Sequence, residues 1–304
     1  NKILSASTIN PLTPLGTIFA LSGGTVDVAQ AVVEAVGDNA MITTTQTPLI
    51  TVTGNGTYNL ASSIGPSFSM VVLKGTTTAT DTLTGLVVGT ERPLQHQGPL
   101  LHALNTTVSA HQILTIDTAL LDASAPLIDI INSTLTVSGP GISLLKNASL
   151  TTTAGYTGTL LALNAGTLAL TNNSLLESVT QNLVRIGGDF LTLTNGSRLT
   201  FSSLSSGLLI KTGGGSVIDI NGAVINFGGT GGNQITVNNT LVPDYIDTNF
   251  PQLTVHLTNG ASPSNITIQG NAIKNTSLGR ISRPNGGSLF QLDGPNTKLI
   301  IRGN

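Results

Sequence analysis

The stretch from Thr159 to Phe227 repeats one pattern three times. It reads TLLALNAGTLALTNNSLL from Thr159, NLVRIGGDFLTLTNGSRLTF from Asn182 and GLLIKTGGGSVIDINGAVINF from Gly207. In each copy a leucine-led apolar segment is followed by a Gly or Asn turn and a second alternating segment. The copies start 23 and 25 residues apart (182 − 159 and 207 − 182), a period typical of stacked repeats. The pattern predicts one coil of a β-solenoid per copy.

The same lead-in, a turn residue before a leucine-led strand, occurs outside this stretch at Pro48, Pro99, Pro126 and Ser288. The repeat therefore extends over residues 48–304, and we expect an all-β, single-stranded parallel β-helix there. Its last copy stops in mid-pattern at Asn304. We therefore expect continuation into further domains or self-association, because an uncovered coil end exposes unpaired backbone groups that can pair with another chain.

Residues 1–47 differ from the repeat and are predicted to form an N-terminal cap segment. Its segment TVDVAQAVVEAVG has valines at helix-like spacing, with Thr25 as N-cap and Gly37 as a stop. We expect a short helix here that covers the apolar end of the first coil, the alternative being a pair of strands.

Three segments interrupt the repeat, near 75–98, 238–251 and 276–287, and each contains proline. Proline does not suit a central strand, so these segments are predicted to be inserted loops, where binding sites often lie. The second contains Asp244, Tyr245 and Asp247, two carboxylates and an aromatic ring that could bind a sugar or Ca²⁺. The alternative for these residues is turn chemistry without a ligand.

The composition excludes several classes of partner and site. Only 9% of the residues are charged and the net charge is −2, so nucleic acid and anionic lipid are not expected partners. The chain has no cysteine, which removes disulfides and thiolate metal sites. No apolar run reaches the roughly 18 residues of a membrane span, and no motif for a metal or another cofactor was found. Since the chain begins with Asn1 and not Met, we expect it to be part of a longer polypeptide.

Alternation along the strands predicts which side chains point inward. It places Leu168, Leu170, Leu191, Leu193, Ile218 and Ile220 inside. Aligning the copies gives two predicted outward columns: His102, Asp129, Ala162 and Arg185, and then Thr136, Ala169, Thr192 and Asp219. Neither column brings carboxylates together, so no catalytic residue is predicted. Ice binding by a threonine array is a further alternative, but it needs an unbroken threonine column, which this alignment interrupts. The asparagines that follow the inner pairs, Asn172, Asn195 and Asn221, are expected to stack at turns.

Copies such as LALNAGTLALTNNSLL and LTLTNGSRLTF resemble the passenger domains of bacterial autotransporters and filamentous-haemagglutinin-type adhesins. The resemblance implies a right-handed parallel β-helix, exported to the bacterial cell surface and used for adhesion or display. We therefore expect a non-enzymatic extracellular rod, an adhesin shaft or a fibre or layer subunit, whose loops contact a cell-surface glycan or protein. The alternative is a carbohydrate-active β-helix, either a polysaccharide lyase or hydrolase or a sugar-binding rod.

Overall fold

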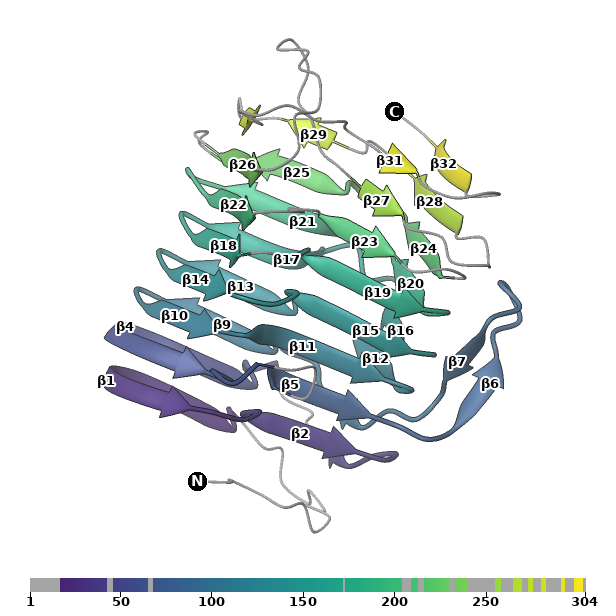
Figure 1. Cartoon of the computed structure of the whole chain (residues 1–304), viewed down its shortest axis with the longest axis horizontal. Helices are drawn as coiled ribbons and strands as arrows, with labels where there is room; N and C mark the ends of the chain where they lie inside the picture. The colour runs from purple at the N-terminus through teal and green to yellow at the C-terminus, as the bar shows by residue number, and fades with distance from the viewer. Residues whose placement is uncertain are drawn as a thin grey trace.

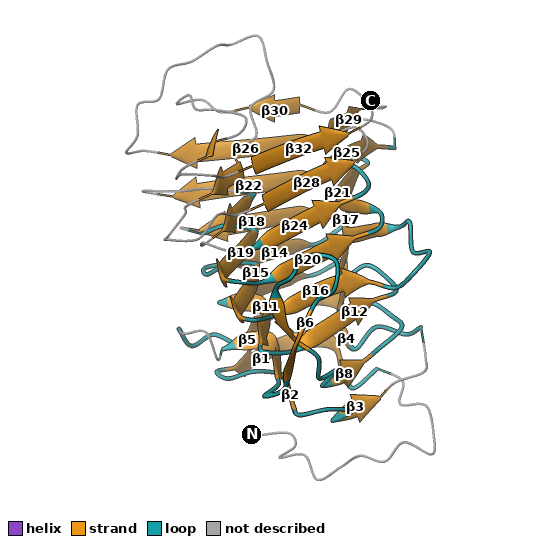
Figure 2. Ribbon diagram, turned by 90° about the vertical axis from the view of Figure 1, so that its right-hand side faces the viewer, coloured by secondary structure: helices purple, strands orange, loops and turns teal. Residues whose placement is uncertain are grey.

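The computed structural model describes residues 17–42, 46–64, 68–171, 173–203, 209–212, 216–229 and 233–239, and the short strands 255–257, 265–269, 273–275, 280–282, 291–292 and 298–302. All regular elements in these ranges are β-strands, and all but one pair of them lie in parallel sheets (Figures 1 and 2). Among the described residues no helix is long and apolar enough to cross a membrane.

The largest sheet has 14 strands in two arms. Two long strands, β1 (Phe19–Val28) and β4 (Ile50–Leu60), run through both arms. The first arm continues with β9 (Leu101–Leu104), β13 (Ile128–Ile131), β17 (Thr159–Asn164), β21 (Asp189–Thr194), β25 (Ile225–Gly228) and β29 (Ile273–Asn275). The second arm continues with β10 (Thr107–Ala110), β14 (Thr134–Val137), β18 (Thr167–Thr171), β22 (Arg198–Ser203), β26 (Gln234–Asn239) and β30 (Arg280–Ser282).

Two further parallel sheets complete the stack. The eight-stranded sheet contains β2 (Val33–Val36), β5 (Ser69–Lys74), β11 (Gln112–Asp117), β15 (Ile142–Lys146), β19 (Leu176–Thr180), β23 (Ile210–Thr212), β27 (Val255–Leu257) and β31 (Gln291–Leu292). The six-stranded sheet contains β12 (Leu120–Ala123), β16 (Ser149–Thr152), β20 (Leu183–Ile186), β24 (Val217–Ile220), β28 (Asn265–Gln269) and β32 (Lys298–Arg302). Two small pairs remain: β3 (Met41–Ile42) with β8 (Leu94–Gln95), and the antiparallel hairpin of β6 (Thr78–Thr80) and β7 (Val87–Gly89).

The chain visits these sheets in a fixed order. From β9 onward it passes through the first arm, the second arm, the eight-stranded sheet and the six-stranded sheet, and then returns to the first arm. One such passage is a coil, and each strand pairs in parallel with the strands one coil before and after it. The architecture is therefore all-β and solenoid-like.

The core lies inside the coils and is aliphatic. Inward positions stack in register from coil to coil, as in the buried column Ile50, Leu101, Ile128, Leu161, Leu191 and Ile225. The six residues predicted to point inward, Leu168 and Leu170 among them, are all buried. The predicted alternation is thus confirmed. Because every coil buries its aliphatic face against two neighbours, such a stack needs few aromatic residues.

The predicted helix between Thr25 and Gly37 is wrong. This segment forms β1 and β2, which pair in parallel with β4 and β5. In β2 the buried Val33 and Ala35 alternate with the exposed Glu34 and Val36, the two-residue period of a strand. Valines are β-branched and favour strands, and pairing with the next coil outweighs the weak helical spacing. Gly37 does end the element, with a φ of +82°.

The phase of the predicted repeat is also wrong. Thr159 pairs with Asp189, so the copy that follows the one at Thr159 begins at β21. The supposed copy at Asn182 is instead the start of β20, in the six-stranded sheet. Each of the four strands in the coil that starts at Thr159 carries a leucine at its first or second position, as in Leu160, Leu168, Leu176 and Leu183, so the sequence pattern matches at several positions within one coil.

Buried asparagine satisfies backbone groups at one corner. Asn182 is fully buried, donates to the Leu144 carbonyl at 2.9 Å and accepts from the Ala148 N–H at 2.8 Å. The asparagines predicted to stack at turns do not form one stack. Asn195 and Asn221 lie at two different corners, and Asn172 lies outside the described residues.

Replacing Asn182 with alanine is expected to lower the free energy of unfolding by about 1–3 kcal/mol, because it leaves the buried Leu144 carbonyl and Ala148 N–H unpaired. The control is Asn173→Ala, which removes a single exposed bond to the Ser138 carbonyl. Urea denaturation followed by circular dichroism measures both. Equal losses for the two variants would show that the buried network does not stabilise the corner.

Candidate functional site

The insertion after β5 forms a hairpin that lies against the outer face of the six-stranded sheet. We call residues 76–92 the clasp; it contains β6 and β7. In Figure 2 the clasp lies over the strands of the six-stranded sheet, and its residues line a common cavity with those of β12, β16 and β20. One insertion thus covers strands from three successive coils.

Backbone hydrogen bonds attach both ends of the clasp to the stack. Gly75 N–H donates to the Asp117 carbonyl at 2.9 Å, just before the clasp begins. At the other end Leu120 N–H donates to the Glu91 carbonyl at 2.8 Å. Between them β7 lies so close to the corner after β11 that a Cβ on Gly89 would be 2.3 Å from the Thr118 carbonyl carbon. Glycine at position 89 permits this close approach.

Asp81 organises the tip of the clasp and fixes it to β20. Its Oδ2 accepts from the Thr84 N–H at 2.9 Å and the Thr84 hydroxyl at 2.6 Å, and Arg185 Nη2 lies 3.3 Å away. Partial burial raises the pKa of Asp81, but the hydrogen bonds from Thr84 and Arg185 outweigh burial and leave the pKa below its ordinary value. The carboxylate therefore stabilises both the local turn and the contact with the third covered coil.

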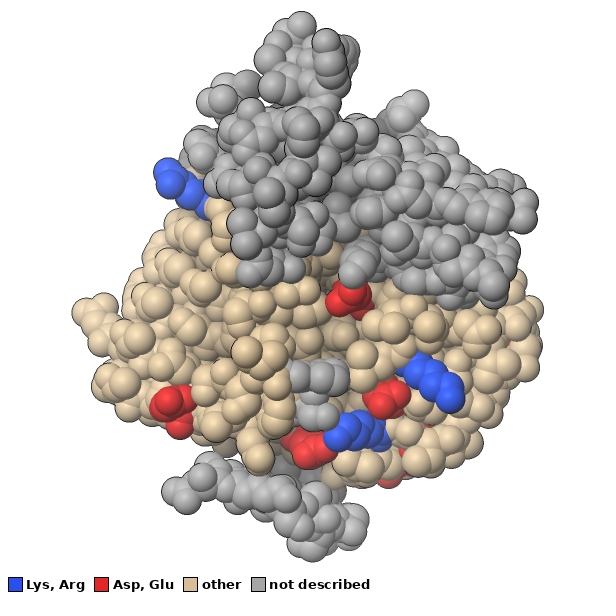
Figure 3. All heavy atoms as spheres, viewed as in Figure 1, with Lys and Arg blue, Asp and Glu red and all other residues tan. Residues whose placement is uncertain are grey.

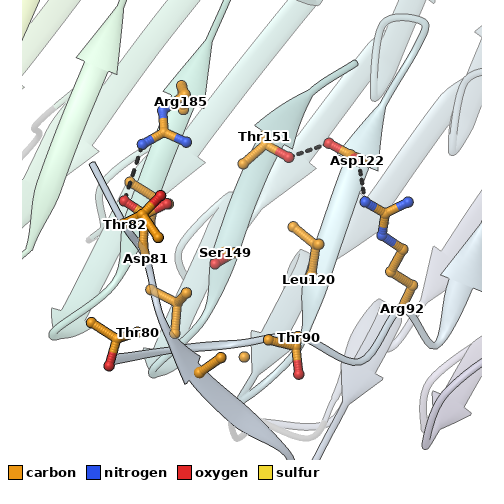
Figure 4. A pocket seen from close by; sticks show the side chains of 14 residues that line it. Thr80, Asp81, Thr82, Thr90, Arg92, Leu120, Asp122, Ser149, Thr151 and Arg185 are labelled. Carbon is orange, nitrogen blue, oxygen red and sulfur yellow. Dashed lines mark hydrogen bonds and ion pairs between the residues drawn. The ribbon is translucent and has the colours of Figure 1, made fainter. Parts of the chain in front are cut away.

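A second ion pair fixes the other end of the clasp. Arg92 Nη2 lies 3.0 Å from Asp122 Oδ2 on β12, and the hydroxyl of Thr151 on β16 donates to Asp122 Oδ1 (Figure 4). Asp122, Thr151 and Arg185 occupy the same outward position on neighbouring strands. They form a continuous polar row beneath the clasp.

A cavity of about 470 Å³ lies between the clasp and the sheet. Its floor is the outward column of Leu120, Ser149 and Leu183, parallel to the polar row. Ser149 is buried, and its hydroxyl is the one buried side-chain polar atom without a hydrogen-bond partner among the described residues. Figure 4 shows Ser149 between the two ion pairs. The cavity therefore combines an apolar floor, hydroxyl groups and balanced charge.

Lowering the pH is expected to release the clasp. Because the folded-state pKa of Asp81 is lowered, its contribution to clasp stability is complete above its ordinary value of 3.8 and is lost as the pH falls through the folded-state pKa. The pKa of Glu91 is also lowered, by hydrogen bonds from the Thr77 hydroxyl and the Thr76 N–H. Hydrogen exchange of the clasp amides, corrected for intrinsic rates, should therefore accelerate below about pH 3.8.

The control for this release is Asp81→Asn, which keeps an acceptor for Thr84 but has no charge for Arg185. Its clasp should already exchange faster at neutral pH and show a weaker acid response, with Glu91 supplying the remainder. An acid response identical to that of the wild-type chain would contradict the role given to Asp81.

The polar run Glu91–Gln97, which the sequence predicts to be a solvated loop, is not solvated throughout. His96 is buried, its Nε2 lies 3.1 Å from the Pro99 carbonyl, and burial lowers its pKa. Its neighbour Arg92 pairs with Asp122. The run therefore packs onto the stack.

One predicted outward column is partly right. His102 and Asp129 are neighbours, with His102 Nδ1 2.8 Å from Asp129 Oδ2, and Ala162 follows. The next residue is Thr192, whereas Arg185 belongs to the clasp row. Asp129 still has no acidic neighbour in this column, and no described group of three or more His, Cys, Asp or Glu residues could hold a metal ion.

The second predicted column is also only partly right, and the register reveals five aligned threonines instead, a column that ends where Arg198 follows Thr167. Thr136 and Ala169 are neighbours, but Thr192 and Asp219 belong to other strands. Thr25, Thr57, Thr107, Thr134 and Thr167 are aligned on the second arm. The adjacent outward column, which holds Asp27, Asn59, Ser109, Thr136 and Ala169, is chemically mixed, so the threonine surface is one residue wide.

The predicted site residues Asp244, Tyr245 and Asp247 lie outside the described residues, as do most of the segments 238–251 and 276–287. The segment 75–98 is described in full and forms the clasp and β8. Charged side chains are sparse among the described residues on the face that Figure 3 shows, as the composition indicates. Sequence reasoning missed the row of Asp122, Thr151 and Arg185, because it had placed Arg185 beside Ala162.

No family model matches the chain, and neither a curated protein nor a solved structure matches it. The function is therefore inferred from the residues and their geometry.

Proposed function

We propose that the chain is a right-handed, single-stranded parallel β-helix that serves as a rod on the bacterial surface, either as an adhesin shaft or as a subunit of a fibre or layer. The observation that carries this proposal is the unbroken parallel register of the coils. In the first arm, β4, β9, β13, β17, β21 and β25 pair in succession, and the other two sheets follow the same rule. A chain that stacks on itself in one direction grows longer and not wider.

The interior supports a mechanical role. Each coil is joined to the next by parallel hydrogen-bond ladders and by aliphatic columns such as Leu135, Leu168 and Leu199, all buried. The clasp adds a lateral connection, because its Arg92 and Asp81 bind side chains on β12 and β20. A rod built in this way resists bending through contacts that every coil repeats.

The partners follow from this architecture. A coil end has unpaired backbone groups and an apolar interior, so we propose that the rod continues into further domains or associates with another copy. Loops and outer faces would contact a cell-surface glycan or protein.

Two experiments test this function. Negative-stain electron microscopy of the purified chain should show straight rods of copies joined end to end, because the coils of one chain, spaced by about 4.8 Å, do not by themselves make an elongated particle. Immunogold labelling of producing cells should decorate the outer surface. Compact particles without an elongated axis would contradict the rod, and label confined to the cell interior would contradict the surface location.

A carbohydrate-active β-helix is the second candidate, and the clasp cavity is the observation that favours it. The cavity has hydroxyl, carboxylate and guanidinium groups around an apolar floor. Incubation with neutral and acidic polysaccharides, followed by a reducing-end assay, separates cleavage from a structural role. Release of new reducing ends that is lost in Asp122→Asn would establish the enzyme and overturn the purely structural proposal.

A further inference from the structure

The cavity beneath the clasp has the size and lining of a ligand site. Its volume of about 470 Å³ lies within the range of small-molecule pockets, roughly 300–1,000 Å³. Leu120, Leu183 and Val88 supply apolar surface, and threonine hydroxyls from both the clasp and β16 line it. Ligand pockets typically combine such apolar surface with a few convergent polar groups.

Ser149 is the residue that the fold alone does not explain. Its neighbours in the same outward column are Leu120 and Leu183, so a leucine would continue the column. Instead a hydroxyl lies there, 2% exposed as a residue and without a hydrogen-bond partner among the described side chains and backbone. A buried unpaired polar group costs about 1–3 kcal/mol, and a ligand hydroxyl could supply its missing partner.

The charges of the cavity select an uncharged ligand. Two carboxylates, Asp81 and Asp122, are paired with two guanidinium groups, Arg185 and Arg92, so the lining is neutral as a whole. A charged ligand would have to displace one member of a pair. A neutral ligand rich in hydroxyls can accept from the remaining guanidinium N–H groups and donate to the carboxylates while both pairs persist.

We propose that this cavity binds a neutral sugar unit, with its C–H surface on the leucines and its hydroxyls on Ser149, the threonines and the two ion pairs. This inference does not depend on the rod function: the clasp would serve as a binding site whether the stack is a shaft or an enzyme. It places the glycan contact of this protein on the side of the stack.

The test titrates the full chain calorimetrically with neutral tetrasaccharides of glucose, mannose and xylose, and with tetragalacturonate as the charged probe. At least one neutral probe should bind the wild-type chain more tightly than tetragalacturonate does. Ser149→Leu fills the cavity with the side chain that its column neighbours already have, and it should weaken binding at least about tenfold. Ser149→Ala keeps the space and removes only the hydroxyl, so a loss of about threefold or more is expected.

The matched control is Thr136→Leu, the same kind of outward substitution on β14 of the second arm, which should bind like the wild type. The proposal is overturned if no neutral probe binds, if tetragalacturonate binds most tightly, or if Ser149→Leu and Ser149→Ala both bind like the wild type. Electron microscopy of the same samples separates the two proposals: intact rods without sugar binding overturn the site alone, and compact particles that bind sugar overturn the rod alone.

Discussion

Replacing Leu168 with alanine is expected to lower the free energy of unfolding by about 2–5 kcal/mol. Leu168 is fully buried and lies between Leu135 and Leu199 in an inner column, so truncation leaves a cavity that three coils share. The neighbouring coils hold the backbone in register and limit its collapse into the space. Chemical denaturation followed by far-ultraviolet circular dichroism measures the loss.

The control is Thr167→Ala in the same strand, whose side chain points outward. It changes strand propensity without opening the core, and its cost should stay below about 1 kcal/mol. If Thr167→Ala were as destabilising as Leu168→Ala, the assignment of inner and outer faces in β18 would be wrong.

Replacing Gly89 with alanine is expected to detach the clasp while leaving the stack folded. The new Cβ would lie 2.3 Å from the Thr118 carbonyl carbon and 2.5 Å from the Ala119 nitrogen, and backbone at a strand corner cannot move aside easily. Overpacking of this kind costs about 1–3 kcal/mol, comparable to the docking contacts of a single hairpin. Limited proteolysis measures the outcome at Leu83, which is 80% exposed in the loop between β6 and β7.

Cleavage at Leu83 should accelerate about tenfold or more in Gly89→Ala. Thr90→Ala, an exposed substitution at the next position, should cleave like the wild type. Circular dichroism should show that the stack of both variants is intact. A clasp that remains protected in Gly89→Ala would mean that β7 does not pack against the corner after β11.

The sequence was sufficient to predict an all-β, solenoid-like fold and its inner faces. Alternation has a period of two, and Leu191 and Leu193 are buried with Thr192 between them, as that period requires. It was insufficient for the phase of the repeat, since β20 and β21 both follow a turn and both place a leucine near their start, Leu183 and Leu191. Which strand stacks on which depends on turn lengths and pairing between coils, and these are not local properties.

The same reason explains why the candidate site was missed. Asp81, Asp122 and Arg185 are far apart in sequence and meet because an insertion from one coil crosses three others. Only the correct register places Asp122 and Arg185 in one row. The helix predicted near Val33 failed similarly, because pairing with β5 decided the conformation. The one available signal was the insertion of residues 75–98, with its charged and proline-containing run.

Paired cysteines test the register of the stack most directly, because the chain has no cysteine of its own. Ala162 and Thr192 are partners on β17 and β21, at the separation of adjacent strands, about 4.8 Å. A chain with cysteines at positions 162 and 192 should therefore be joined rapidly by a short bifunctional thiol reagent. A chain with cysteines at positions 162 and 185 should not, because Arg185 lies in another sheet. Rapid joining of 162 with 185 and none of 162 with 192 would contradict the coil order from which the rod, the clasp row and the cavity are all derived.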